Sequence, residues 1–266
     1  MKRHVPLNHK GQLYEVETCW YKSKRVKSYV HYKNDLENEY YEIFYENGEE
    51  KLEGYYKKGK RHGLFHGFYE SGNKEFQIMF KNGLREGIHE HWYRNGNIKS
   101  SHRHKNDKIH GNYSKWYENG QMKEEGTYKN GEKNGLWTEW YKNGQKKSES
   151  IWKDGEYTGI HTDWSENGQK DIETTYKDGK NNTTFYYENG QKRRQYTLNK
   201  DRNYDGLTIE WYENGQKKSE GHQKDGKFDG IGTGWYEDGQ KKGEYTWKEG
   251  KMISKKEWNE DGSVKK

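Results

Sequence analysis

Cysteine, proline and long apolar runs are almost absent from this 266-residue chain. With Cys19 as its only cysteine, the chain has no internal disulfide framework and no CxxC metal site. No apolar run reaches the 18 residues of a membrane-spanning helix, and residues 1–14 contain no apolar stretch of signal-peptide length. We therefore expect a soluble, cytoplasmic protein.

Aliphatic side chains are scarce as well. Leucine, isoleucine, valine and phenylalanine make up roughly 12% of the chain, a level that usually indicates disorder. Tryptophan (11 residues) and tyrosine (24 residues) supply the apolar area instead, because each buried aromatic side chain removes about 150–250 Å² from water. The 32 glycines and single proline fit regular turns better than an unstructured linker. The composition therefore predicts a folded chain with a thin, aromatic core.

Charge is abundant but balanced. The 49 basic and 43 acidic residues are mixed along the sequence, which has a net charge of +6 and neither a basic arm nor an acidic tail. Such mixing is typical of a solvated surface with cross-strand ion pairs. Nucleic acid is therefore an unlikely main partner. The small positive charge permits contact with anionic membrane lipid, which stays an alternative.

Glycine recurs at a fixed step. Six glycines stand 24 residues apart: Gly48, Gly72, Gly96, Gly120, Gly144 and Gly168. The same turn continues at Gly190, Gly215, Gly239 and Gly262. A fixed period of this size predicts a repeat array, in which function belongs to the surface that a stack of copies presents. We predict one array over residues 1–266, with divergent repeats at 1–38 and regular repeats at 39–266.

Each copy has the pattern of two strands. Within residues 135–158, two aromatic-rich runs are bounded by Asn143-Gly144 and Asp154-Gly155, which is a hairpin signal. We predict that the first turn is a three-residue loop with a left-handed glycine, so that Tyr141 pairs with Gln145. The expected fold is all-β: a single-layer antiparallel β-meander solenoid of about eleven two-stranded repeats of ~24 residues.

The predicted register assigns side chains to two faces. One face is expected to carry Leu136, Trp140, Lys146, Ser148, Ser150 and Trp152. The other is expected to carry Trp137, Glu139, Tyr141, Gln145, Lys147 and Glu149. Along the array, the first face would stack two neighbouring aromatic columns that form the core.

The first of these columns consists of Trp20, Phe44, Phe68, Trp92, Trp116, Trp140, Trp164, Tyr186, Trp211, Trp235 and Trp258. The second consists of Tyr32, Tyr56, Phe80, Tyr128, Trp152, Tyr176 and Trp247. Aliphatic residues after a turn glycine are expected to join them in the core: Leu64, Ile88, Leu136, Ile160, Leu207 and Ile231.

The opposite face is the candidate partner surface. It repeats tyrosines and lysines at the 24-residue step, of which we single out Tyr69, Tyr93, Tyr117, Tyr141, Tyr187, Tyr212, Tyr236, Lys99, Lys123 and Lys147. Exposed tyrosine is a favoured interface residue, which indicates protein binding. The alternative interpretation is a stacking ladder with columns of ion pairs that holds the sheet together.

Catalysis and metal binding would need residues that break the repeat. The best candidates are five histidines: His89, His91, His102, His104 and His110. Metal ligands must converge on one point, and the predicted register places His102 and His104 on one face and His89 and His91 on the other. Nor is there a GxSxG or Walker-type motif. We therefore expect no enzyme activity, no metal and no cofactor.

The repeat unit is most complete over Gly111–Gly135. It contains Trp116-Tyr117-Glu118-Asn119-Gly120-Gln121 and then Tyr128-Lys129-Asn130-Gly131. This unit resembles the bacterial variant of the MORN repeat, and the resemblance covers nearly the whole chain. Departures lie at Lys24 and Glu39, which replace turn glycines, and around Asn181-Asn182-Thr183, where two residues are missing.

Arrays of this variant look like the YwqK-type antitoxins of bacterial toxin–antitoxin systems. The resemblance implies a cytoplasmic, non-catalytic protein that neutralises a cognate toxin by direct contact. MORN repeats also imply an alternative, a scaffold that contacts anionic membrane lipid or another protein.

Overall fold

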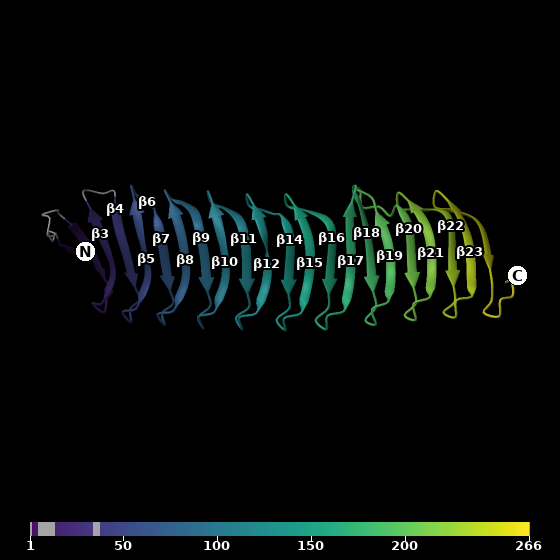
Figure 1. Cartoon of the computed structure of the whole chain (residues 1–266), viewed down its shortest axis with the longest axis horizontal. Helices are drawn as coiled ribbons and strands as arrows, with labels where there is room; N and C mark the ends of the chain where they lie inside the picture. Colours follow the sequence, from purple (N-terminus) through teal and green to yellow (C-terminus); the bar gives the residue numbers. More distant parts are fainter. Residues whose placement is uncertain (1, 5–13, 34–37, 266) are drawn as a thin grey trace. The chain divides into compact units, whose positions relative to one another are not determined.

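The computed structural model describes residues 2–4, 14–33 and 38–265. Residues 5–13 and 34–37 of the predicted divergent N-terminal repeats lie outside this description, as does the side chain of Glu39. Every regular element in the described residues is a β-strand (Figure 1), which confirms the predicted all-β class. Among these residues, no helix has the length and apolar character needed to span a membrane.

The chain forms two compact units, Met1–Asn134 and Gly135–Lys266. The first contains β1 (Lys2–His4), β2 (Tyr14–Trp20), β3 (Val26–Lys33), β4 (Asn38–Phe44), β5 (Glu50–Lys57), β6 (Lys60–Arg61), β7 (Gly63–Phe68), β8 (Lys74–Lys81), β9 (Leu84–Trp92), β10 (Ile98–Lys105), β11 (Lys108–Trp116), β12 (Met122–Lys129) and β13 (Glu132–Lys133). The second contains β14 (Gly135–Trp140), β15 (Lys146–Lys153), β16 (Glu156–Trp164), β17 (Lys170–Lys177), β18 (Lys180–Tyr186), β19 (Lys192–Leu198), β20 (Gly206–Trp211), β21 (Lys217–Lys224), β22 (Lys227–Trp235), β23 (Lys241–Lys248) and β24 (Lys251–Glu257).

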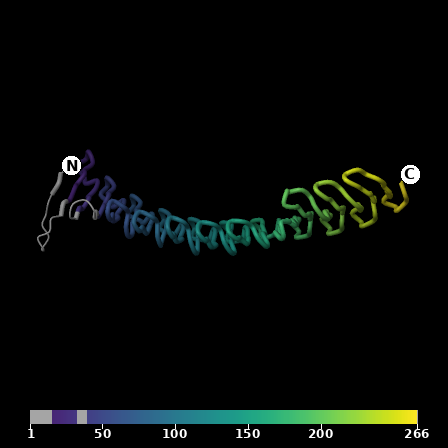
Figure 2. Tube along the Cα trace, turned by 90° about the horizontal axis from the view of Figure 1, so that it is seen from above, coloured from purple at the N-terminus to yellow at the C-terminus, as the bar shows by residue number. Residues whose placement is uncertain are grey.

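Within each unit, long strands that follow one another in sequence pair antiparallel, as a meander requires. The two-residue strand β6 pairs with β5, and β7 pairs with β5 as well. Figure 2 shows the same order from above, with the colour advancing from strand to strand along each unit. Each long strand thus lies between its two neighbours, and counterparts in adjacent copies are separated by one intervening strand, as Trp137 and His161 are by β15.

Two kinds of turn alternate along the chain. In the first, the Tyr141 N–H donates to the Gln145 carbonyl (2.8 Å) and the Gly144 N–H donates to the Tyr141 carbonyl (3.0 Å). Gly144 has φ 88°, so the predicted three-residue loop with a left-handed glycine is confirmed. In the second, Asp154 (φ 49°) and Gly155 (φ 82°) form a two-residue loop, the geometry that suits the twist of a tight hairpin.

One residue after each three-residue loop lies outside the strand pairing. Glu139 pairs with Ser148 and Trp140 pairs with Lys146, which leaves Lys147 as an extra residue, a β-bulge. An extra residue inverts the alternation of side chains beyond it. The two faces therefore differ from those predicted by simple alternation.

We name the two faces after residues of β14. The Trp140 face carries Leu136, Thr138, Trp140, Lys146, Glu149, Ile151 and their counterparts in other repeats. The Trp137 face carries Trp137, Glu139, Ser148, Ser150, Trp152 and their counterparts. The prediction that Trp140 shares a face with Leu136 and Lys146 is confirmed, whereas its grouping with Ser148, Ser150 and Trp152 is wrong. The placement of Glu149 beside Trp137 is also wrong, because Glu149 pairs with Thr138.

The core lies on the Trp137 face. Its most buried apolar side chains are Trp137 (1% exposed), Phe65 (2%) and Phe80 (8%). The Phe65 ring packs edge-on against Phe80 (5.2 Å between centroids) and Tyr56 (5.4 Å). Gly54 lies directly beneath that ring, since a Cβ there would stand 2.3 Å from it. The second predicted aromatic column, which includes Tyr56 and Phe80, therefore belongs to the core as expected.

The first predicted column does not share that face. Its members pair as Trp140 does: Phe68 lies opposite Lys74, and Trp235 opposite Lys241. The Phe68 and Trp235 rings are half-buried on the Trp140 face. The prediction that the two columns stand side by side is wrong, because the bulge separates them onto opposite faces.

Candidate functional site

The predicted tyrosine row ties consecutive repeats together. The Tyr93 hydroxyl donates to the Trp116 carbonyl (2.8 Å), and the Tyr141 hydroxyl donates to the Trp164 carbonyl (2.8 Å). The same bond recurs at Tyr21, Tyr45, Tyr69, Tyr187, Tyr212 and Tyr236, at 2.7–2.9 Å. Each bond satisfies a carbonyl at the end of a strand in the next copy. The tyrosine hydroxyls therefore hold consecutive repeats together.

The asparagine two residues later makes a second tie. The Asn143 side-chain oxygen accepts from the Gln145 N–H (3.0 Å), which fixes the turn, and its amide donates to the Glu166 carbonyl of the next copy (2.8 Å). Asn47, Asn95, Asn189 and Asn214 make the equivalent inter-repeat bond. The repeated Tyr-x-Asn-Gly sequence is therefore explained by the joining of neighbouring turns.

Lysines of the candidate surface cover the tyrosine rings. The Lys99 ammonium lies 5.6 Å from the Tyr93 ring centroid and that of Lys123 lies 5.2 Å from the Tyr117 ring centroid, within range of a cation–π contact. Lys147 instead forms an ion pair with Glu139 (3.4 Å). The structure thus brings the predicted tyrosines and lysines together as a ladder.

Burial raises the pKa of the Tyr69, Tyr93 and Tyr212 hydroxyls, so these tyrosines keep the proton that they donate. The row joins neighbouring repeats, as the alternative interpretation holds, but through hydroxyl–carbonyl bonds and cation–π contacts. That a partner binds on it stays a prediction.

The Trp140 face carries its own ladder of charge. The Lys146 ammonium forms an ion pair with Glu149 (2.5 Å) and lies 5.8 Å from the Trp164 ring centroid in the next copy. The same lysine–glutamate pairing recurs at Lys170 with Glu173, Lys217 with Glu220 and Lys241 with Glu244. Exposed pairs of this kind add little stability. Their effect is to leave this stripe of the face without a large excess of charge.

Beside that ladder lies a row of exposed aliphatic side chains, which we name the aliphatic row. Three members stand on adjacent strands of the second unit: Leu136 on β14 (55% exposed), Ile151 on β15 (40%) and Ile160 on β16 (49%). Leu207 on β20 (38%) and Ile231 on β22 (59%) continue the pattern.

The prediction that Leu64, Leu136, Ile160, Leu207 and Ile231 belong to the core is wrong, because all of them are exposed. Their recurrence directly after a turn glycine was visible in the sequence. Their exposure was not, because it follows from the bulge that moves the core to the other face. Several exposed aliphatic side chains in one row indicate an interaction surface more directly than the tyrosines do.

The histidine-rich repeat also differs from the prediction. His102 on β10 pairs directly opposite His89 on β9, so the two side chains share a face. The His89 and His91 Nε2 atoms lie 2.9 Å apart, which places His91 beside them. The predicted separation of His89 and His91 from His102 and His104 is therefore wrong. His110 lies apart, where its Nδ1 accepts from the Asn130 N–H (3.3 Å).

Comparison with solved structures gives distant likenesses. The Tc holotoxin pore of Photorhabdus luminescens matches 98% of this chain over 15% of its own, with 9% identity and a TM-score of 0.23. The TcdB2–TccC3 structure without its hypervariable C-terminal region matches 98% over 18%, with 9% identity and a TM-score of 0.25. This chain thus spans less than a fifth of the length of either. No curated protein matches it.

A family model does match. The model described as MORN repeat variant matches residues 61–82, 85–106, 109–130, 133–154, 157–178 and 204–225. Repeats of this family generally serve as non-catalytic modules that bind proteins or membrane lipid. These six matches together span just under half of the chain, and each covers the same kind of strand pair, so the matched stretches are MORN-variant repeats.

Proposed function

We propose that this chain is a non-catalytic binding protein whose partner is another protein, held on the Trp140 face of the second unit. The observation that carries this proposal is the aliphatic row, whose side chains are 38–59% exposed. Apolar side chains aligned on neighbouring strands gain free energy when a partner removes them from water. The half-buried tryptophans beside the row add the residue type most enriched in binding hot spots.

The charges beside the row favour a protein over a membrane. Lys146, Lys170, Lys217 and Lys241 are each paired with a glutamate on the same strand. Attraction to anionic lipid depends on lysines whose charge is not already neutralised. A surface with apolar side chains flanked by paired charges instead matches the composition of a protein interface with a polar rim.

We further propose that the partner is a toxin and that the chain acts as its antitoxin in the bacterial cytoplasm. This step is supported by the resemblance of the repeat array to YwqK-type antitoxins. Neutralisation would follow from occlusion, because a row that crosses several strands can cover a broad area of a partner without any catalytic group.

The test begins with a pull-down by the purified chain from its own cell lysate, at low and at high salt. We expect one protein in stoichiometric amount at both salts, because apolar contacts are insensitive to screening. Ile160→Lys should weaken that complex by roughly 30-fold, equivalent to the loss of one hot spot of about 2 kcal/mol. The captured protein, expressed alone, should arrest growth, and co-expression of the wild-type chain should restore it.

The matched control is Leu84→Lys, which changes a leucine of similar exposure (45%) in the other unit. It should bind and neutralise as the wild type does. Equal capture by Ile160→Lys and the wild type would contradict the assignment of the face. Binding only to anionic vesicles, lost at high salt, would instead support the membrane-scaffold alternative.

A further inference from the structure

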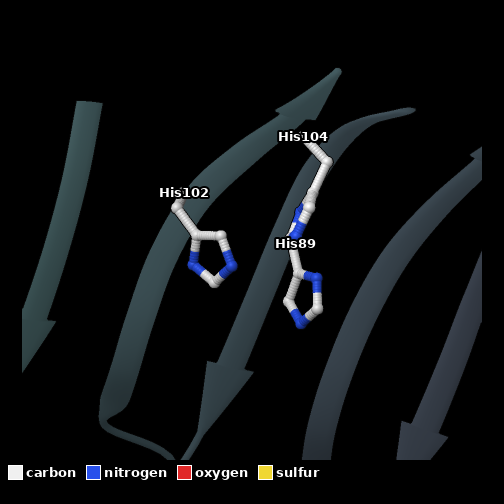
Figure 3. A group of neighbouring side chains, drawn as sticks. All are labelled: His89, His102 and His104. Atoms are coloured by element: carbon white, nitrogen blue, oxygen red, sulfur yellow. The ribbon is translucent and has the colours of Figure 1, made fainter. Parts of the chain in front are cut away.

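Three histidines of the first unit form a cluster in which two are buried and one is half-buried (Figure 3). His89 comes from β9, and His102 and His104 come from the neighbouring strand β10. One ring nitrogen of each lies within 4.8 Å of a ring nitrogen of the other two. His89 (9% exposed) and His104 (5%) are buried, and the ring centroids of His89 and His102 are 4.5 Å apart.

The fold does not require histidine at these positions. The preceding copy, 24 residues earlier, has Phe65, Ile78 and Phe80 in the same places, with the same pairing between strands. The following copy has Tyr113, Gly126 and Tyr128. Since apolar and aromatic residues fill this part of the core in the neighbours, three histidines in one copy are a departure from the repeat rather than a part of it.

Three ring nitrogens of the cluster are left without partners. The Nδ1 atoms of His89, His102 and His104 are all buried and make no hydrogen bond. A buried polar atom without a partner is costly and rare in native structures. Three such atoms in one cluster call for a shared ligand, and the lone pair of a neutral imidazole nitrogen is a metal ligand.

From this geometry we infer that His89, His102 and His104 bind one late first-row transition-metal ion, with Zn²⁺ as the representative case. Imidazole suits zinc, copper and nickel. Three histidines around tetrahedral Zn²⁺ leave a fourth position for water or another ligand. Ligand nitrogens around such an ion stand about 3.4 Å apart, so the rings need only close inward from their present spacing.

The surroundings are compatible with a bound cation. Burial lowers the pKa of His89 to about 3 and of His102 to about 4, and it lowers the pKa of His104 as well. The rings are therefore neutral near pH 7, the form that binds a metal. The cation nearby, Arg85, is held by Asp107 through its Nε atom (3.0 Å), so its charge is compensated.

The test uses the full chain after treatment with a chelator. Equilibrium dialysis against Zn²⁺ should give one ion per chain, and Co²⁺ should give the visible absorption of a four-coordinate site. The decisive variant combines His89→Phe, His102→Ile and His104→Phe, which restores the residues of the preceding copy. Because that copy folds with them, the variant should fold and should bind no ion.

The control is His222→Gln, which removes an exposed histidine of the second unit and should leave both signals unchanged. Should the triple variant not fold, His102→Ile alone replaces it and should weaken Zn²⁺ binding by more than roughly 100-fold. Mutation of a residue that only hydrogen-bonds a metal ligand already lowers metal affinity by about 10–100-fold, and loss of a ligand should cost more. No binding by the wild type, or equal binding by the wild type and the variant, would overturn the inference.

Discussion

At the scale of single residues, side chains repeated in every copy serve mainly to join one copy to the next. Tyr141 spans from its own turn to the Trp164 carbonyl, and Asn143 spans to the Glu166 carbonyl. These bonds satisfy backbone groups that the strand pairing leaves free at the turn. A residue that recurs in a solenoid is therefore explained first by its neighbours in the stack.

Tyr141→Phe tests this explanation. It keeps the ring and removes the hydroxyl that donates to the Trp164 carbonyl (2.8 Å). We expect the free energy of unfolding to fall by about 1 kcal/mol, because one hydrogen bond is lost and a part-buried carbonyl loses its donor. Chemical denaturation measures the change.

The control for that change is Tyr157→Phe, which keeps the stacking of its ring on Tyr176 (5.3 Å). Tyr157→Phe should change the free energy of unfolding by only a few tenths of 1 kcal/mol, as is usual for a surface substitution that removes no bond between repeats. Equal losses in both variants would contradict a special role for the repeated tyrosines.

At the scale of the hairpin, the left-handed glycine sets the register of the whole copy. Gly144 closes a three-residue loop, and the bulge at Lys147 then decides which side chains face the core. Lys24 occupies the equivalent place in the first described hairpin with φ 68°, and the loop there keeps the same backbone bonds. The turn at Lys24 therefore departs from the repeat in its residue type, whereas its backbone geometry is the same.

Substitutions at Gly144 and at Lys24 should have opposite effects on the free energy of unfolding. Gly144→Ala should lower the free energy of unfolding by about 1–2 kcal/mol, because a Cβ is unfavourable at positive φ. Lys24→Gly should raise it by up to about 1 kcal/mol for the same reason. Thermal unfolding of the two variants and the wild type measures both changes. If Gly144→Ala left the free energy of unfolding unchanged, that result would contradict the loop geometry.

At the scale of the whole molecule, stability is distributed along an array. Among the residues that the structure describes, the long strands pack against their neighbours in sequence, and the apolar side chains are spread along the array. In such a molecule, stability is close to a sum of the contributions of repeats and of the interfaces between adjacent repeats. Damage to one copy should therefore stay local.

Phe65→Ala tests this property and also the assignment of the faces. Phe65 is 2% exposed and packs on Tyr56 and Phe80, so the change should cost about 3–5 kcal/mol. Native-state hydrogen exchange should accelerate in β5, β7 and β8 and much less in β10–β12.

Phe68→Ala is the matched control, since Phe68 lies on the same strand but on the Trp140 face, half-buried. Its effect should be clearly smaller. A larger effect at Phe68 than at Phe65 would show the core on the face that simple alternation predicted.

Sequence alone determined what is local and periodic. The 24-residue step, the strand pairs, both kinds of turn and the all-β class follow from glycine spacing and aromatic pattern, because turn geometry depends on a few adjacent residues. The repeated Tyr and Asn were visible as well, although their bonding partners about 23 residues away were not.

Only the tertiary structure decided which face is the core. One extra residue at Lys147 inverts the alternation, and nothing in residue type distinguishes a paired lysine from a bulged one. That inversion exposes Leu136 and Ile160, and pairing across strands brings His89 beside His102. The candidate binding row and the histidine cluster could not be located before the register was known, because both depend on contacts between strands rather than on the order of residues along one strand.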